Sequence, residues 1–254
     1  MKNIKALLFL FVAIGAFSCS VSLANAATYY VSATSTNGYG VGSNSYTTTQ
    51  AQNKATPWLT PEYAHNTMGS GDTLIFNDGT YDLATYLNVN RSGTWIAEND
   101  LMVTFKTGTA QTRVINLIGL GIDLTLDGII LDANNVTQYN ISTSPGSYSY
   151  DITLNGVKML NPTMSFLNIP STVTDLAIND SIAEGATTTR NGISMLALAT
   201  STIVIDGLDI TQSGHSQTST GLISIFATAP NVDVTVRNVT GVLNLDQKPV
   251  FQFN

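Results

Sequence analysis

Few residues in this chain could carry out chemistry, because only 10 of its 254 residues are Lys or Arg and only 2 are His. Lys158 is the most suggestive, since the repeat described below places Asp132 one coil before it and Glu184 one coil after it. β-Elimination from a uronate needs a base for the proton beside the carboxylate and a cation against the developing charge. Lys158 is therefore a catalytic candidate, with Asp132 and Glu184 as substrate-binding candidates. The alternative is a surface ladder of ion pairs, which contributes little to stability.

Arg190 and His215 form a second candidate pair. They lie in the segments 184–191 and 211–221, which we predict to be loops that leave adjacent coils at the same phase. A base beside a carboxylate-binding arginine could border one groove, so both are catalytic candidates, and ordinary polar loop residues are the alternative. Neither an Asp-x-Asp-x-Asp loop nor a glycine-rich aspartate repeat is present to support calcium. The cofactor therefore stays unknown: the aspartates could recruit Ca²⁺, but no motif supports it, and we assign no metal ligand.

An internal repeat must position these side chains. The first and third positions of each copy are Leu, Ile or Val, which point inward because strand side chains alternate between faces. The fifth position is always Gly, Asp or Asn, the residue types that best tolerate a positive φ. We therefore predict the same bend in every copy, 24 to 31 residues after the previous one. The copies superimpose without gaps and are residues 124–129, 152–157, 176–181, 203–208 and 234–239.

Two further strands accompany each bend. One precedes it, around Ile115, Ile141, Leu167, Met195 and Ile225. Another follows it, as in residues 129–131, 157–159 and 208–210. Three short strands in a coil of about 25 residues predict an all-β solenoid in which each strand pairs with the same strand of the next coil. A β-sandwich is the alternative, but it has no reason to keep a positive-φ column at a fixed phase.

The N-terminal part has a different organisation. Residues 1–26 combine a basic start, an apolar run of about a dozen residues and a small-x-small end, the pattern of a cleaved secretory signal peptide. Lipidation at Cys19 is the alternative, although the bulky Phe17 disfavours it. Residues 27–70 should supply a first strand, a polar surface loop over 33–56, and a capping helix that starts at Thr60-Pro61-Glu62. The coils should occupy residues 71–254, beginning with the buried strand 74–76.

Charge and cysteine content exclude several classes of protein and partner. Removing Lys2 and Lys5 with the signal peptide leaves 8 basic and 17 acidic residues, a net charge of −9, and leaves no cysteine for a disulfide. Repulsion from phosphates excludes nucleic acid as a partner, and strongly anionic polysaccharides are disfavoured as well. The apolar run is too short to span a membrane. A surface rich in Ser, Thr and Asn suits neutral sugars.

Several stretches resemble right-handed parallel β-helix proteins of the pectate-lyase-like superfamily. They are residues 29–32, residues 56–60, the Gly71-Asp72-Thr73-Leu74-Ile75 and Asp78-Gly79-Thr80-Tyr81 stretches, and the coils just aligned. Their order is most similar to the entry of alginate lyase and chondroitinase-B relatives. The resemblance implies a right-handed parallel β-helix with an N-terminal helical cap. It brings no catalytic residue, because the Asn-Lys-Ser and Arg-His-Gly contexts of those lyases do not occur here.

Two functions follow as expectations. The first is a secreted carbohydrate-active protein, similar to polysaccharide lyases, that acts on or binds an extracellular polysaccharide. The second is a non-catalytic surface or adhesion solenoid that binds glycans or is structural, which the scarcity of Lys, Arg and His favours. The final residues, 250–254, alternate like an inner strand and then stop. Because an open coil end is prone to aggregation, we expect further coils or a partner there.

Overall fold

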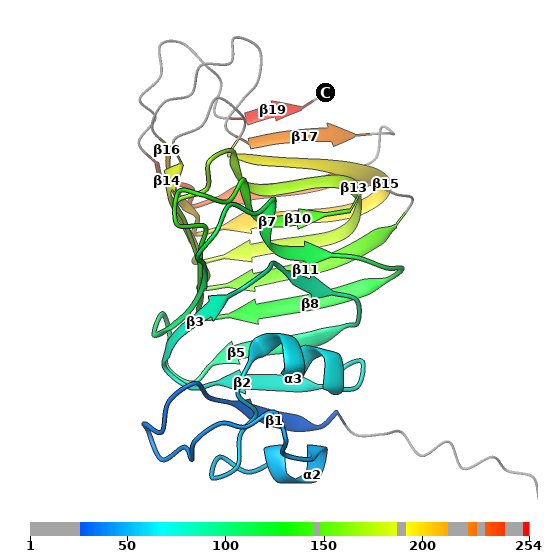
Figure 1. The fold of residues 1–254 in the computed structure, drawn as a ribbon. Helices are drawn as coiled ribbons and strands as arrows, with labels where there is room; N and C mark the ends of the chain where they lie inside the picture. Colours follow the sequence, from blue (N-terminus) through cyan, green and yellow to red (C-terminus); the bar gives the residue numbers. More distant parts are fainter. Residues whose placement is uncertain are drawn as a thin grey trace, which may run out of the picture.

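Strands stacked one above another form the body of the protein in the computed structural model (Figure 1). The structure describes residues 26–144, 148–186, 192–212, 223–227, 232–241 and 251–253. Over these residues the chain is an all-β parallel solenoid of about five turns with little helix, and the predicted right-handed parallel β-helix is confirmed. Each full coil supplies one strand to each of three outward faces, which matches the three strands per coil read from the repeat.

All strand pairs in the described residues are parallel, and each joins a strand to its counterpart in the next coil. The first face contains β4 (Leu87–Val89), β7 (Arg113–Leu117), β10 (Tyr139–Thr143), β17 (Ile223–Ala227), β19 (Phe251–Phe253) and the first parts of β13 (Ser165–Asn179) and β15 (Ile193–Asp206). The second contains β1 (Thr28–Val31), β2 (Thr73–Phe76), β5 (Gly93–Ala97), β8 (Ile122–Asp127), β11 (Ser149–Asn155), β18 (Asp233–Arg237) and the remainder of β13 and β15. The third contains β3 (Gly79–Leu83), β6 (Val103–Thr107), β9 (Ile129–Asp132), β12 (Lys158–Leu160), β14 (Ile182–Ala186) and β16 (Asp209–Gln212).

The bend between the second and third faces follows the sequence repeat residue by residue. The register of β8, β11, β13, β15 and β18 aligns the five repeat copies as the sequence predicts. Every predicted bend residue has a positive φ, from +46° at Asp180 to +74° at Gly207. Polar residues before the bend stack between coils, as where the Asn179 amide donates to Asn155 Oδ1 at 2.9 Å. The third face therefore leaves the second at a similar angle in each coil.

An aromatic cluster fills the core of the first coils. Phe76, Trp95 and Phe105 are fully buried, and their ring centroids lie 5.0–6.0 Å apart. Burying each such ring stabilises the fold by roughly 1.5–3 kcal/mol. Leu74 and Phe76 of β2 are completely buried, as predicted for this strand, whereas Ile75 between them faces outward and is only half-buried. The core begins one strand earlier than predicted, because Tyr29 and Val31 of the neighbouring β1 are buried in it as well.

The helix α3 (Pro61–Thr67) begins where the sequence predicts. Thr60 is its N-cap, accepting from the Tyr63 amide at 3.3 Å, and Pro61 occupies the first turn. The helix packs against β1 and β4 and buries Ala64 and His65. His65 Nε2 accepts from the Asn90 backbone amide at 3.2 Å, which ties the helix to the turn after β4.

Residues 33–56 are largely the polar surface loop that their composition predicts, with one helical turn that the composition does not indicate. They contain a further helix, α2 (Thr48–Ala51), whose Thr47 and Gln50 form a reciprocal capping box. Such a box satisfies two backbone amides locally, so one helical turn needs no apolar periodicity. The sequence carried this signal as Thr47-x-x-Gln50.

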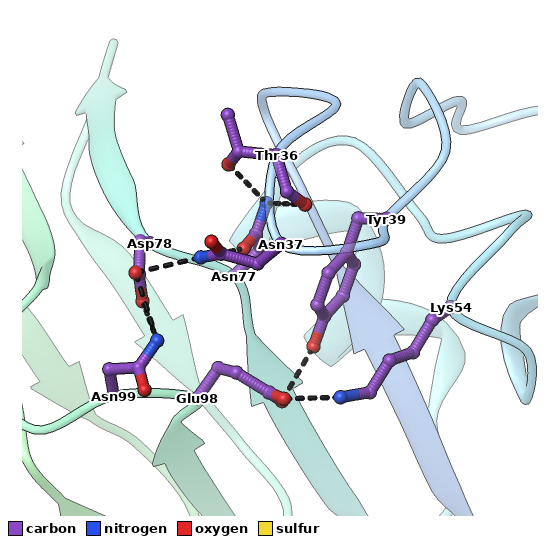
Figure 2. Close-up of polar contacts among 8 residues, drawn as sticks. All are labelled: Thr36, Asn37, Tyr39, Lys54, Asn77, Asp78, Glu98 and Asn99. Atoms are coloured by element: carbon purple, nitrogen blue, oxygen red, sulfur yellow. Dashed lines mark hydrogen bonds and ion pairs between the residues drawn. The ribbon is translucent and has the colours of Figure 1, made fainter.

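Polar contacts hold the same stretch against the first coil (Figure 2). Asn37 donates to Asp78 at 2.7 Å, and the Tyr39 hydroxyl donates to Glu98 at 2.9 Å. Lys54 forms an ion pair with Glu98 as well. Burial, and then the hydrogen bond to Glu98, raise the pKa of the Tyr39 phenol above its ordinary value. These contacts clamp residues 33–56 to the solenoid.

Candidate functional site

The predicted lysine and carboxylate candidates lie on the outward side of the third face. In β9, β12 and β14 the outward and inward residues alternate, with Leu131, Met159 and Ala183 in the core. Lys158 stands opposite Ile130 and Ile182 in the register, while Asp132 and Glu184 both stand opposite Leu160. We call this surface the lysine face and define it by Lys106, Asp132, Lys158 and Glu184.

Charged groups on the lysine face are paired with one another. Lys158 Nζ lies 2.5 Å from Glu184 Oε1, whereas the ion pair of Asp132 is with Lys106, at 4.0 Å. Asp132 also accepts from the Asn134 amide at 2.8 Å and from the Asn161 side chain at 3.1 Å. The structure thus brings Lys158 to Glu184 and gives Asp132 a different partner. An ammonium group that donates to a carboxylate must first lose that proton before it can act as a base.

The second candidate pair is Arg190 and His215. Arg190 and His215 lie outside the described residues, so their predicted groove remains a prediction. Their neighbours in the described part of the chain are Ala186 at the end of β14 and Gln212 at the end of β16. Those two residues stand opposite each other in the register of the third face.

A row of threonines runs along the outward side of the second face. None of these threonines is among the candidate residues predicted from the sequence. Register pairing places each threonine directly opposite the next one, from coil to coil. The row consists of Thr28, Thr73, Thr94, Thr125 and Thr153. It continues as Ala177, Val204 and Thr235. We call the outward surface of β2, β5, β8 and β11 the threonine face.

The hydroxyls of this row point outward and are not engaged by any protein group in the described part of the chain. Among the described residues, no hydrogen bond joins any of the five consecutive threonine side chains to a protein group. The hydroxyls repeat at about 4.8 Å, the separation of neighbouring strands. Threonine has few side-chain rotamers in a strand, so the row is held in place without hydrogen bonds of its own.

Aspartates border the threonine row. Asp123, Asp151 and Asp175 stand in register on successive coils, two residues before the row. Burial, and then repulsion from Asp175, raise the pKa of Asp151 above its ordinary value. Within the described strands of the second face, the basic residue on the outward side is Arg237, on the distant β18. The face therefore carries a negative potential that repels anions.

A hollow of about 130 Å³ opens on this face between β5 and β8. It is lined by three hydroxyl residues, one carboxylate and two glycines, namely Ser92, Thr94, Thr125, Asp123, Gly71 and Gly93. The Ser92 hydroxyl accepts from the Asp123 amide at 3.0 Å, which joins the two coils beside the hollow. The sequence could have indicated part of this site, because Thr125 and Thr153 occupy the outward second position of the repeat.

Searches of the structure and of known proteins add little to this geometry. Within the described residues, no three His, Cys, Asp or Glu side chains gather closely enough to hold a metal ion. No helix in that part of the chain is long and apolar enough to cross a membrane. A scan against protein-family models finds no match, and a search of curated proteins finds no relative. The chain therefore shares a parallel solenoid with pectate-lyase-like proteins, and no family relation to them is shown.

Proposed function

We propose that this protein is a secreted β-solenoid that binds an extracellular polysaccharide without cleaving it. The observation that carries the proposal is the row of threonines on the second face, whose hydroxyls have no partner among the described residues. A polysaccharide presents hydroxyl groups at regular intervals, and a regular row of free hydroxyls can exchange hydrogen bonds with them. The signal-peptide pattern of residues 1–26 supports an extracellular location.

The paired charges of the lysine face support binding over catalysis. Lys158 and Glu184 satisfy each other, and Asp132 is engaged by Lys106 and by two amide groups. None of these groups lines the hollow on the threonine face. A binding protein needs only a complementary surface, whereas a lyase needs a base and a cation around one substrate position.

The binding proposal is tested with the purified chain lacking residues 1–26. Microcrystalline cellulose, chitin and soluble mixed-linkage β-glucan serve as neutral probes, and alginate and polygalacturonate serve as acidic ones. We expect depletion from solution, or a calorimetric signal, with at least one neutral probe and no rise in reducing ends. If no probe is bound, the proposal is wrong.

Polysaccharide lyase activity is the second candidate, supported by the outward position of Lys158 beside a carboxylate. Its side chain is 26% exposed, so a substrate could reach the ammonium group. A lyase would raise the absorbance of alginate, polygalacturonate or chondroitin in the band of unsaturated uronates. Lys158→Met should abolish that rise. An unchanged absorbance with all three polymers rejects this candidate.

A further inference from the structure

We propose that the hollow between β5 and β8 seats one sugar unit of an extended, uncharged polysaccharide whose chain runs along the threonine face. This inference rests on the proposed binding function and deepens it, since it names the anchoring position and the class of polymer. It follows from the shape of the hollow, its hydrogen-bonding groups and the charge around it.

Two glycines, Gly71 and Gly93, line the hollow. Gly71 has a φ of +88°, and a Cβ at this position would meet no other atom within 4 Å. A larger residue at position 71 would therefore project into open space beside the hollow. Gly93 precedes Thr94, and a Cβ there would meet the Met68 methyl group at 2.3 Å, so this position stays small for packing reasons. The edge of the hollow is thus left open while its floor is tightly packed.

The lining offers the groups that a sugar ring needs. Thr94 and Thr125 stand directly opposite each other, and no protein group within the described residues engages their hydroxyls. A carboxylate such as Asp123 accepts hydrogen bonds more strongly than a neutral group does. Threonine methyl groups can contact the C–H groups of a ring. The backbone of two paired strands holds all three side chains, so little ordering is required on binding.

The surrounding charge selects a neutral polymer. Asp123 is followed in register by Asp151 and Asp175 on the next two coils. A polyuronate lying along this face would bring a carboxylate close to each of them. Like charges in such close approach repel each other at every coil, which weakens the binding of a polyuronate. An uncharged chain avoids this cost while making the same hydroxyl contacts.

The periodicity of the face sets the direction of the chain. Neighbouring threonines are about 4.8 Å apart along the solenoid axis, which is close to the length of one sugar unit in an extended polysaccharide. A chain along this axis therefore meets one threonine for each sugar unit, from Thr73 to Thr153. The row ends at Ala177 and Val204, which offer no hydroxyl.

The test compares the wild-type chain with the double variant Thr94→Val, Thr125→Val. Valine keeps the shape and the strand preference of threonine and removes only the hydroxyl. Thr235→Val is the matched control, because it makes the same change in the same row beyond the two apolar positions. Isothermal titration with soluble mixed-linkage β-glucan, and depletion onto cellulose and chitin, give the affinities. Circular dichroism and melting temperatures verify that the variants fold.

The expected result is that the double variant binds the neutral probe about tenfold or more weakly, since each lost hydrogen bond contributes about 1 kcal/mol. Thr235→Val should bind like the wild type, and binding should change little between low and high salt. Wild-type binding that the double variant retains overturns the proposed seat while leaving polysaccharide binding intact. Tighter binding of alginate or polygalacturonate than of any neutral probe overturns the neutral class. If the wild-type chain binds no polysaccharide but inhibits ice recrystallisation, both proposals fail and the row orders water instead.

Discussion

The threonine face and the lysine face belong to consecutive strands of the same coils, yet they differ in whether their polar side chains are paired within the protein. On the lysine face, Lys158 pairs with Glu184 and Lys106 pairs with Asp132. On the threonine face, the hydroxyls of Thr94, Thr125 and Thr153 have no protein partner among the residues that the structure describes. A group that is already satisfied must be released before it can bind a ligand, whereas a group facing water exchanges one partner for another. The more charged surface is therefore the less available one.

The largest effect that we predict acts through the helical cap, which packs against β1 of the second face and β4 of the first face. His65 is buried, its Nε2 accepts from Asn90, and its Nδ1 has no partner within the described residues. Burial is the main cause that lowers the pKa of His65 from 6.5 to about 4. The unfolded chain therefore takes up the proton first as the pH falls. The free energy of unfolding has its full value above pH 6.5. It should decrease by about 2 kcal/mol between pH 6.5 and pH 5.

Urea unfolding at pH 7 and pH 5 measures this loss. His65→Gln should lessen the loss between the two values, and His215→Gln, which changes the other histidine, should leave it intact. Equal pH dependence in the wild-type protein and in His65→Gln would contradict the assignment.

The next effect concerns the bend between the second and third faces, where a substituted glycine should lower the free energy of unfolding. Gly128 lies in the bend with a φ of +66°, and a Cβ there would approach Asp100 Oδ1 at 2.8 Å. Gly156 has a similar φ of +56° but open space around it. Gly156→Ala should destabilise by about 1 kcal/mol through backbone strain alone, and Gly128→Ala by about 2 kcal/mol through strain and overpacking together. Equal denaturation midpoints for the two variants would show that the contact with Asp100 is easily relieved.

A smaller effect concerns the ion pair of the lysine face. The side chains of Lys158 and Glu184 are 26% and 45% exposed, so solvent screens their attraction. A double-mutant cycle with Lys158→Met and Glu184→Gln should give a coupling of at most about 1 kcal/mol, weaker in high salt. A coupling of several kcal/mol that salt does not reduce would mean that the pair is shielded from water.

The smallest effect concerns the stability of the threonine face. Thr153→Val removes a hydroxyl that has no protein partner within the described residues, and it keeps a β-branched side chain. The free energy of unfolding should change by less than about 0.5 kcal/mol. A larger loss in thermal or urea unfolding would show that the hydroxyl has a structural role, and the contrast between the two faces would then weaken.

The bends of the solenoid could be predicted from the sequence because they repeat within it. Aligning residues 124–129 with the later copies is sufficient to place Gly128, Gly156 and Gly207 at positive φ. The repeat does not indicate the N-terminal part of the threonine row, because β2 and β5 come before the first recognisable bend. Their Thr73 and Thr94 therefore have no repeat copy to align with.

Pairings between polar side chains were less predictable, because such contacts have no periodicity. The repeat placed Asp132, Lys158 and Glu184 on one face, but it did not show that Lys106 stands directly opposite Asp132. The contacts of Asn37 with Asp78 and of Tyr39 with Glu98 join segments 41 and 59 residues apart. Nothing in the composition of residues 33–56 indicates such partners.

The most direct test of the account is a comparison of neutral polysaccharide binding between two variants that each alter one face. The first carries Thr94→Val, Thr125→Val and Thr153→Val, and the second carries Lys158→Met and Glu184→Gln. With soluble mixed-linkage β-glucan in a titration calorimeter, and cellulose and chitin in depletion assays, we predict a loss of about tenfold or more for the first variant. The second should bind like the wild-type protein. Loss of binding in the second variant with full binding in the first would contradict the account.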